Sequence, residues 1–297
     1  MPSPKPPLLS EYVVDQLTID DEPAFRPVGL YGDLKEVLRR SGYRFRVLPR
    51  SLAGRWDRAL LLNLTFWGAS EGGDVLVDRS LPADVVAHAA WHHLASRALA
   101  AAPGAAQSPE ALFLGEAIAS AFDLYLVGRL LGRAPDSAFL ETQVPAMAEV
   151  TQAAGLAAAD FAALLHDIAA APERAFADLR ELLWDVTQAL LACENAGSAL
   201  CALARFDRHR FAPLLHRYEL SNWVLYARAY GRKRLATAAG AAASRDPSAR
   251  RARAVDRALR EAADPLDWLT TRWVLPALRP PRRARAHGAA LPRANQL

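Results

Sequence analysis

The sequence has little cysteine and almost no lysine. Its 297 residues include two cysteines, Cys193 and Cys201, which are too few for the disulfide framework of a small secreted domain. They lie eight residues apart in a region expected to be helical, so about 12 Å would separate them, beyond disulfide reach. We therefore expect free or buried thiols in a reducing, cytoplasmic compartment. Three of the 36 basic residues are lysines, and this bias toward arginine, with abundant alanine, indicates a GC-rich bacterial genome.

Long apolar runs are also missing. None reaches the roughly 18–20 residues that cross a bilayer, so no membrane span is expected. The first residues, Met1 to Pro7, lack the apolar segment of a secretory signal, which supports the cytoplasmic prediction. Apolar residues still make up 52% of the chain, and this share is enough for a sizeable core.

The positive charge is concentrated in one part of the chain. The net charge is +4, and residues 245–297 carry 12 arginines against five acidic residues. Such clusters bind phosphate backbones or anionic surfaces in some proteins and form solvated helix faces or disordered tails in others. No base-stacking aromatic residue lies close to the two arginine runs, at residues 250–253 and 282–285, so nucleic acid is not an expected partner. A phosphate-binding loop, a dinucleotide-type glycine motif and a nucleophile elbow are absent too.

Hydrophobic periodicity predicts a mainly helical α+β fold. Three β-like runs, at residues 43–48, 59–67 and 74–78, follow a short helix at residues 33–40. From residue 82 onward the pattern is helical almost without interruption, with joints at glycine and proline. The expected helices cover residues 82–101, 109–132, 137–154, 158–170, 173–195, 197–206, 209–230, 251–262 and 265–277.

The same pattern divides the chain into four parts. Residues 1–22 are expected to form an N-terminal tail, and residues 23–103 a small lobe that contains the strands and ends with the first long helix. Residues 104–278 are expected to form a helical lobe, and residues 279–297 a disordered basic tail. The predicted fold class is therefore α+β, predominantly α, with a strand-bearing N-terminal lobe before a helical C-terminal lobe.

Two histidines one helical turn apart are the most informative feature of the sequence. His88 and His92 lie at positions i and i+4, which puts two imidazoles on one helix face about 5–6 Å apart at Cβ. Glu116 follows 24 residues after His92, on the next expected helix. Two imidazoles and a carboxylate form a three-ligand set that leaves a fourth position for water, as in catalytic zinc sites. We therefore expect His88, His92 and Glu116 to converge on one Zn²⁺ ion.

Three short motifs, taken in order, resemble those of gluzincin metallopeptidases, most closely the thermolysin-like kind. The run from Asp84 to His88 matches the approach to the zinc helix, and Glu116-Ala117-Ile118 matches the segment with the glutamate ligand. Upstream, Asn63-Leu64-Thr65-Phe66-Trp67 resembles the strand that lines the substrate groove, which implies groove roles for Asn63, Phe66 and Trp67. The resemblance covers residues 58–125 and implies a zincin-like fold, with the metal helix as the floor of a cleft between two lobes.

The sequence departs from this family at the catalytic base. In the H-E-x-x-H motif a glutamate after the first histidine is the general base, and here that position is Ala89. The family places Asn before the ligand glutamate and Asp four residues after it, where this sequence has Gly115 and Ser120. In metal sites, residues that hydrogen-bond to the ligands orient the ligating imidazoles, and the family's Asn and Asp are residues of this kind. Asp123, seven residues after Glu116 on the same helix face, can take over that role, or it is a solvated or capping carboxylate.

Three functions are compatible with these residues. The first is a metallopeptidase-like protein that binds zinc but lacks the standard base, is inactive as a peptidase, and binds a peptide or protein partner by strand addition. The second is an active metal-dependent hydrolase whose base is His93 or Asp123, with His216 as a candidate donor to a developing oxyanion. The third is a metal-free helical scaffold or interaction protein.

Overall fold

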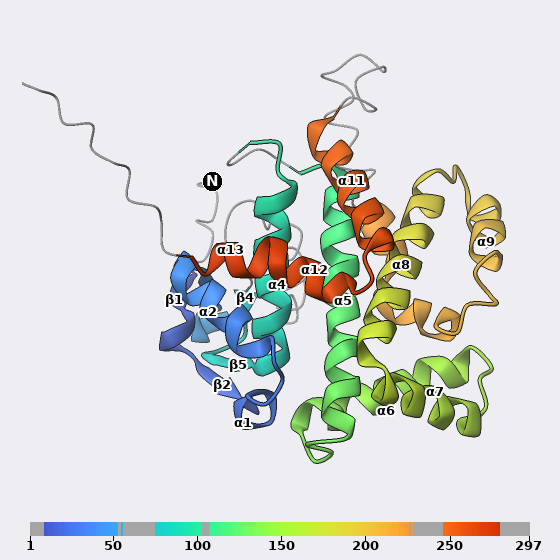
Figure 1. The fold of residues 1–297 in the computed structure, drawn as a ribbon. Coiled ribbons are helices and arrows are strands. Elements are labelled where there is room, and N and C mark those ends of the chain that lie inside the picture. Colours follow the sequence, from blue (N-terminus) through green and yellow to red (C-terminus); the bar gives the residue numbers. More distant parts are fainter. Residues whose placement is uncertain are drawn as a thin grey trace, which may run out of the picture.

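Helix α5 (Pro109–Leu131) runs through the centre of the molecule (Figure 1). It begins after Ser108, whose hydroxyl accepts a hydrogen bond from the first turn of the helix, and it ends at Gly132. Buried side chains cover its whole circumference, as expected for a helix that is apolar on all sides. The computed structural model describes residues 9–52, 55, 75–102, 107–225, 227 and 246–279.

The composition of α5 also meets the criteria for a membrane-crossing helix. It is the one helix of the described residues that is long and apolar enough by length and composition, and 89% of its most apolar stretch is buried by other elements. The sequence had indicated no such run, because Glu116 and Asp123 interrupt it. In this structure α5 has the position of a core helix.

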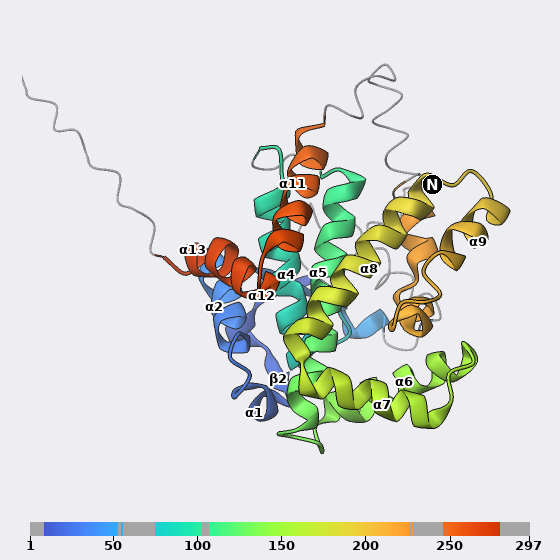
Figure 2. The ribbon, with the colours of Figure 1, turned by 45° about the vertical axis from the view of Figure 1, so that its right-hand side comes forward.

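Three further helices pack around α5. α4 (Ala83–Leu99) lies on one side and α8 (Pro172–Leu191) on the other, and the two views agree (Figures 1 and 2). α11 (Pro247–Glu261) contacts the end of α4 and the start of α5. Its Arg251 donates a hydrogen bond to the carbonyl oxygen of Ala100, just after α4. The candidate ligands therefore lie on two neighbouring helices, α4 and α5, that are held by packing on several sides.

The strands belong to two small sheets in the N-terminal lobe. β1 (Ser10–Val13) pairs antiparallel with β3 (Arg44–Val47), which pairs in parallel with β4 (Val75–Leu76). β2 (Thr18–Asp20) pairs in parallel with β5 (Ser80–Pro82), directly before α4. Two helices and two 3-10 turns complete this lobe: α1 (Glu22–Phe25), α2 (Tyr31–Ser41), Val14–Gln16 and Arg50–Leu52.

The helical lobe continues beyond α5 and then returns to the N-terminal lobe. Residues 265–278 run across α4 and reach α2, where Arg40 donates a hydrogen bond to the carbonyl oxygen of Leu278 (Figure 1). The elements not yet given are α6 (Ala138–Ala153), α7 (Ala158–Ala170), α9 (Ala196–Ala204), the 3-10 helix η4 (Ala212–Tyr218), α12 (Pro265–Leu269), the π-helical segment Thr270–Val274 and α13 (Leu275–Ala277).

The predicted fold class, α+β and predominantly α, is confirmed. Residues 1–22 were expected to form a tail, but the structure has two strands there, β1 and β2. Their partner strands, β3 and β5, lie later in the chain. Within the described part of the expected helix at 209–230, a 3-10 helix at Ala212–Tyr218 precedes an α-helical stretch at 220–225. The division between the lobes at residues 103–104 stays a prediction. The β-like run at 59–67 and the tail from residue 280 lie outside the described residues.

Gly128 marks the closest approach between α5 and the junction of α7 and α8. A Cβ atom there would lie 2.6 Å from the carbonyl oxygen of Ile168 and 2.9 Å from Cβ of Pro172. We expect Gly128→Ala to lower the free energy of unfolding by about 1–3 kcal/mol, because the backbone of a packed helix junction must move. Gly132→Ala is the matched control, since its Cβ would meet nothing within 4 Å. Urea unfolding of both variants checks this, and an unchanged Gly128→Ala midpoint would contradict it.

Candidate metal centre

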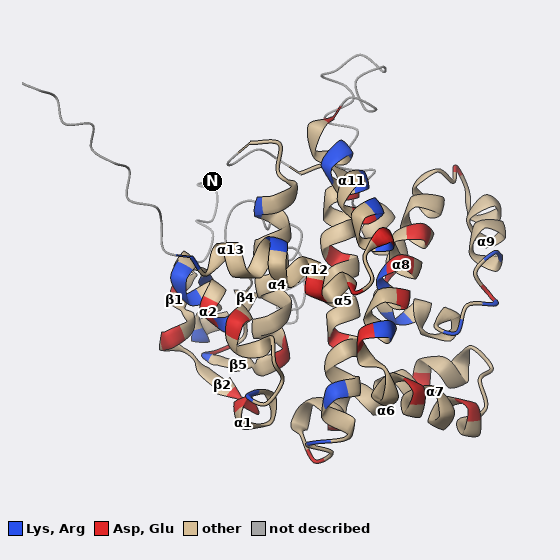
Figure 3. Ribbon diagram, in the orientation of Figure 1, with Lys and Arg blue, Asp and Glu red and all other residues tan. Residues whose placement is uncertain are grey.

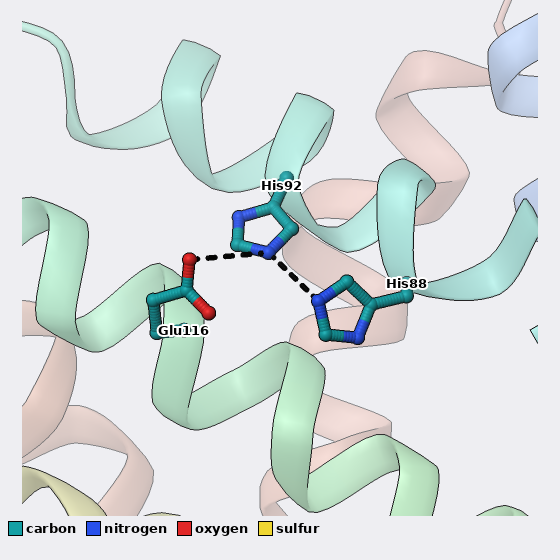
Figure 4. Close-up of side chains that lie close together, drawn as sticks. All are labelled: His88, His92 and Glu116. Carbon is teal, nitrogen blue, oxygen red and sulfur yellow. Dashed lines mark hydrogen bonds and ion pairs between the residues drawn. The ribbon is translucent and has the colours of Figure 1, made fainter. Parts of the chain in front are cut away.

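Helix α4 presents His88 and His92 on one face. The helix begins after Pro82, with Asp84 in its first turn, and continues without interruption to Leu99. The two imidazole rings lie 4.8 Å apart between centroids, and their Nε2 atoms are 3.0 Å apart (Figure 4). One helical turn therefore brings two ring nitrogens to the same point, as the spacing predicts.

Glu116 reaches the same point from α5. Its carboxylate is buried, at 5% exposure, and Oε1 lies 3.5 Å from Nε2 of His92. Figure 4 shows the side chain directed from α5 toward the two rings on α4. One ligand atom from each of His88, His92 and Glu116 lies within 4.8 Å of the others, so the group can hold a metal ion. The predicted convergence of these three residues is confirmed.

Asp123 holds the His88 ring from the opposite side. Its Oδ2 lies 3.0 Å from Nδ1 of His88. A carboxylate at this position fixes a proton on Nδ1, which leaves Nε2 of the neutral ring as a lone-pair donor. The same relay of carboxylate, histidine and metal orients ligands in known metal sites. The structure thus places Asp123 where the sequence argument puts a substitute for the family's outer carboxylate.

The helices α4 and α5 approach closely beside His92. A Cβ atom on Gly115 would lie 3.3 Å from Cβ of Ala95 and 4.0 Å from Nδ1 of His92. The absence of a side chain at residue 115 therefore allows α5 to come near enough for Glu116 to meet the rings. Ser120, one turn after Glu116, is buried at 5% exposure within α5.

The electrostatic environment keeps His92 neutral. Burial, and next the charge of neighbouring His88, hold the pKa of His92 well below its usual value. A neutral imidazole is the form that ligates metal, so little proton competition is expected at His92 near neutral pH. Burial and the adjacent charge of Asp123 raise the pKa of Asp84 to about 6. Asp84 is therefore a third carboxyl group close to the site, after Glu116 and Asp123.

Two neighbours of the site could not be found from sequence. Asp84 was expected as the start of the run that leads into the helix of His88, with no role at the metal site. Tyr218, at the end of η4, is near Asp123: burial raises the pKa of its hydroxyl, the charge of Arg217 lowers it, and the charge of Asp123 raises it further. No sequence spacing relates residue 218 to residue 123, since η4 and α5 meet only in the folded chain.

The other histidine candidates lie in different surroundings. His93 packs edge-on against Tyr43 of the N-terminal lobe, with ring centroids 5.5 Å apart, and burial lowers its pKa to about 4. His216 is exposed on η4 and lines a cavity whose lining residues do not include the three candidate ligands. The groove residues implied by the resemblance, Asn63, Phe66 and Trp67, lie outside the described residues.

Ala89, at the position of the missing base, is buried in the core, as are Ala90 and Trp91 between the same two histidines. Ala89 is 1% exposed and brings no titratable group to the site.

Comparison of the chain with models of known protein families, with curated proteins and with solved structures found no match. The geometry of the three ligand candidates and Asp123 is therefore the basis for assigning a function.

Proposed function

We propose that this protein is a metallopeptidase-like zinc-binding protein of the gluzincin kind that lacks the standard general base and binds a peptide or protein partner. The observation that carries the proposal is the convergence of His88, His92 and Glu116, with Asp123 behind His88. These four side chains come from two helices, α4 and α5, and lie close to one another. Three of them form a metal-ligand set and the fourth orients one ligand, an arrangement that an ordinary buried polar cluster does not need.

Two of the three separations between the donor atoms are close to the value expected for zinc, and the third is within 4.8 Å. Tetrahedral ligands at about 2.0–2.1 Å from one Zn²⁺ ion lie about 3.3 Å from one another. The observed separations of 3.0 Å between the two Nε2 atoms and 3.5 Å between Nε2 of His92 and Oε1 of Glu116 lie on either side of that value. Two imidazole nitrogens and one carboxylate oxygen are also a donor set of catalytic zinc sites.

Each residue has a distinct task in this proposal. His88, His92 and Glu116 hold the ion, and Asp123 keeps the His88 ring in the tautomer that ligates. When bound, zinc polarises a carbonyl group and lowers the pKa of a water molecule. Peptide hydrolysis also needs a group that accepts and relays a proton, and the methyl group of Ala89 cannot do so. The protein is therefore expected to be inactive toward general peptide substrates.

The alternative hydrolase has less support. Its two candidate bases are His93, which faces Tyr43, and Asp123, whose Oδ2 already pairs with Nδ1 of His88 on the side of the ring away from Nε2. Neither residue is placed to take a proton at the point where the ligand atoms meet. A metal-free helical scaffold remains the second candidate, because a buried polar group of this kind is compatible with a purely structural role.

Peptide binding is supported by the small sheets of the N-terminal lobe. Among the described strands, β1 and β4 are the outer members of the three-stranded sheet, and outer strands can pair with an extended peptide. Val77, which follows β4, is 45% exposed and offers an apolar contact beside this edge. Cytoplasmic location, a bacterial source and a partner that is not nucleic acid remain predictions from the sequence.

Metal analysis tests the proposal. We expect the purified protein to bind about one zinc ion per chain, and we expect His88→Ala to abolish binding. Asp123→Asn should weaken binding about 10–100-fold, because an amide no longer fixes the His88 tautomer. His216→Ala, which removes an exposed histidine outside the site, is the matched control and should bind like the wild type. Absence of zinc binding would leave the metal-free scaffold as the function, whereas zinc binding that survives His88→Ala would contradict the assignment of this site.

A further inference from the structure

A cavity of about 590 Å³ lies in the helical lobe, between the end of α8, α9, η4 and the helical stretch at 220–225. Its volume is within the range of about 300–1,000 Å³ that is typical of small-molecule sites. Its lining is mainly aliphatic and includes Leu190, Leu203, Leu215 and Val224. The cavity is separate from the candidate metal centre, because none of His88, His92 and Glu116 lines it.

Helix α9 forms one wall and has little packing of its own. The helix carries no charged residue from Ala196 to Ala204, and most of its ribbon is tan in Figure 3. Only Ala202 is buried, and Leu200 is 68% exposed. Leu225, on the facing wall, lines the cavity and is 62% exposed. Leu200 is not among the lining residues, so Leu225 is the large exposed apolar side chain at the cavity itself, and an apolar molecule in the cavity can cover it.

The polar part of the lining has one sign of charge. Asp207 and Glu219 are carboxylates, and no lysine or arginine is found among the lining residues that the structure describes. Glu219 has φ 47° and ψ 38°, the left-handed region that residues other than glycine seldom adopt. A glutamate there costs conformational energy that a glycine would not, and such positions are concentrated at functional sites. Glu219 lines the cavity, and its Oε2 accepts a hydrogen bond from Nδ2 of Asn222 at 2.8 Å.

We propose that the cavity binds a small cationic amphiphile, with its apolar body against the leucine-rich lining and its ammonium group at Asp207 and Glu219. Charge complementarity selects the sign of the ligand: an ammonium group gains charge-assisted hydrogen bonds from the two carboxylates, whereas an anionic headgroup is repelled. The proposal does not depend on the metal centre, so either can fail without the other.

Three probes with the same chain test the charge preference. Octylamine, octanol and octanoate are titrated into the full-length protein by calorimetry, below the concentrations at which they form micelles. We expect octylamine to bind about tenfold or more tightly than octanol, and octanoate to bind least. The double variant Glu219→Gln, Asp207→Asn should remove most of this preference and keep the binding of octanol. Ala199→Phe, which fills the cavity, should abolish the binding of all three.

Alkylation of the two cysteines shows where the probes bind. Cys193 lines the cavity and is half-buried, whereas Cys201 is exposed and is not among the lining residues, and both thiols are free. Octylamine should slow the reaction of Cys193 with iodoacetamide and leave Cys201 unchanged, as followed by mass spectrometry. Equal binding of octylamine and octanoate, binding without protection of Cys193, or binding of a lysine-rich amphipathic peptide in place of octylamine would overturn the proposal.

Discussion

Ala89→Glu is expected to give the protein zinc-dependent peptide hydrolysis that the wild type lacks. The substitution returns a carboxylate to the position after His88, where it can take a proton from the attacking water. A positioned general base contributes about 10²–10⁴-fold to the rate. The gain should stay at the lower end of this range, because Ala89 is 1% exposed and the new side chain must leave the core to reach the site.

The measurement is cleavage of a general peptide substrate with zinc present. Ala89→Gln has nearly the same shape as the glutamate variant but no base, and it should be as inactive as the wild type. Ala89→Glu combined with His92→Ala keeps the base and removes a ligand, and it should be inactive too. Robust cleavage by the wild type, lost in His92→Ala, would contradict the proposal and favour a hydrolase with an unconventional base.

Asp256→Ala is expected to destabilise the fold by about 3–5 kcal/mol, because it leaves a buried guanidinium without its main partner. Arg180 of α8 is 1% exposed and donates to Oδ1 of Asp256 on α11, and Arg260 donates to Oδ2 at 2.9 Å. Burial lowers the pKa of Arg180 but the pairing with Asp256 opposes this, so the charge is held by the carboxylate. Figure 3 shows opposite charges facing one another where α8 and α11 meet.

The control for this prediction is Asp167→Ala, which removes an exposed carboxylate from α7 and should change the stability by about 0.5 kcal/mol or less. The double variant Arg180→Met, Asp256→Leu removes both charges and should recover most of the stability, since apolar replacements of buried ion pairs are often neutral. Urea unfolding measures all three. A loss below about 1 kcal/mol for Asp256→Ala would mean that water reaches Arg180 in solution.

The helices were predictable because their signals are local. Ser108 caps the start of α5 with its side-chain hydroxyl. Gly42 ends α2 because it adopts a left-handed backbone conformation. Both residue types are recognisable in the sequence. The spacing of His88 and His92 is local in the same sense. The convergence of Glu116 required two helices to pack, and the order of the motifs anticipated it.

The features that the sequence did not reveal depend on contacts between distant residues. β1 and β2 are short strands whose partners follow many residues later, so no hairpin signal marks them. Arg180 and Asp256 are 76 residues apart and pair only once α8 and α11 are packed. Cys193 was expected within a helix at 173–195, but α8 ends at Leu191, and Cys201 lies on the next helix, α9.

The return of residues 265–278 to α2 has a consequence for synthesis on the ribosome. Arg40 and Leu278, which are joined by a hydrogen bond, are 238 residues apart. At about 5–20 residues per second, the second of them is made on the order of 10–50 s after the first. Through that interval the face of the N-terminal lobe that Thr270–Val274 contacts has no partner, so the nascent lobe is expected to be a target for chaperones until translation has passed residue 278.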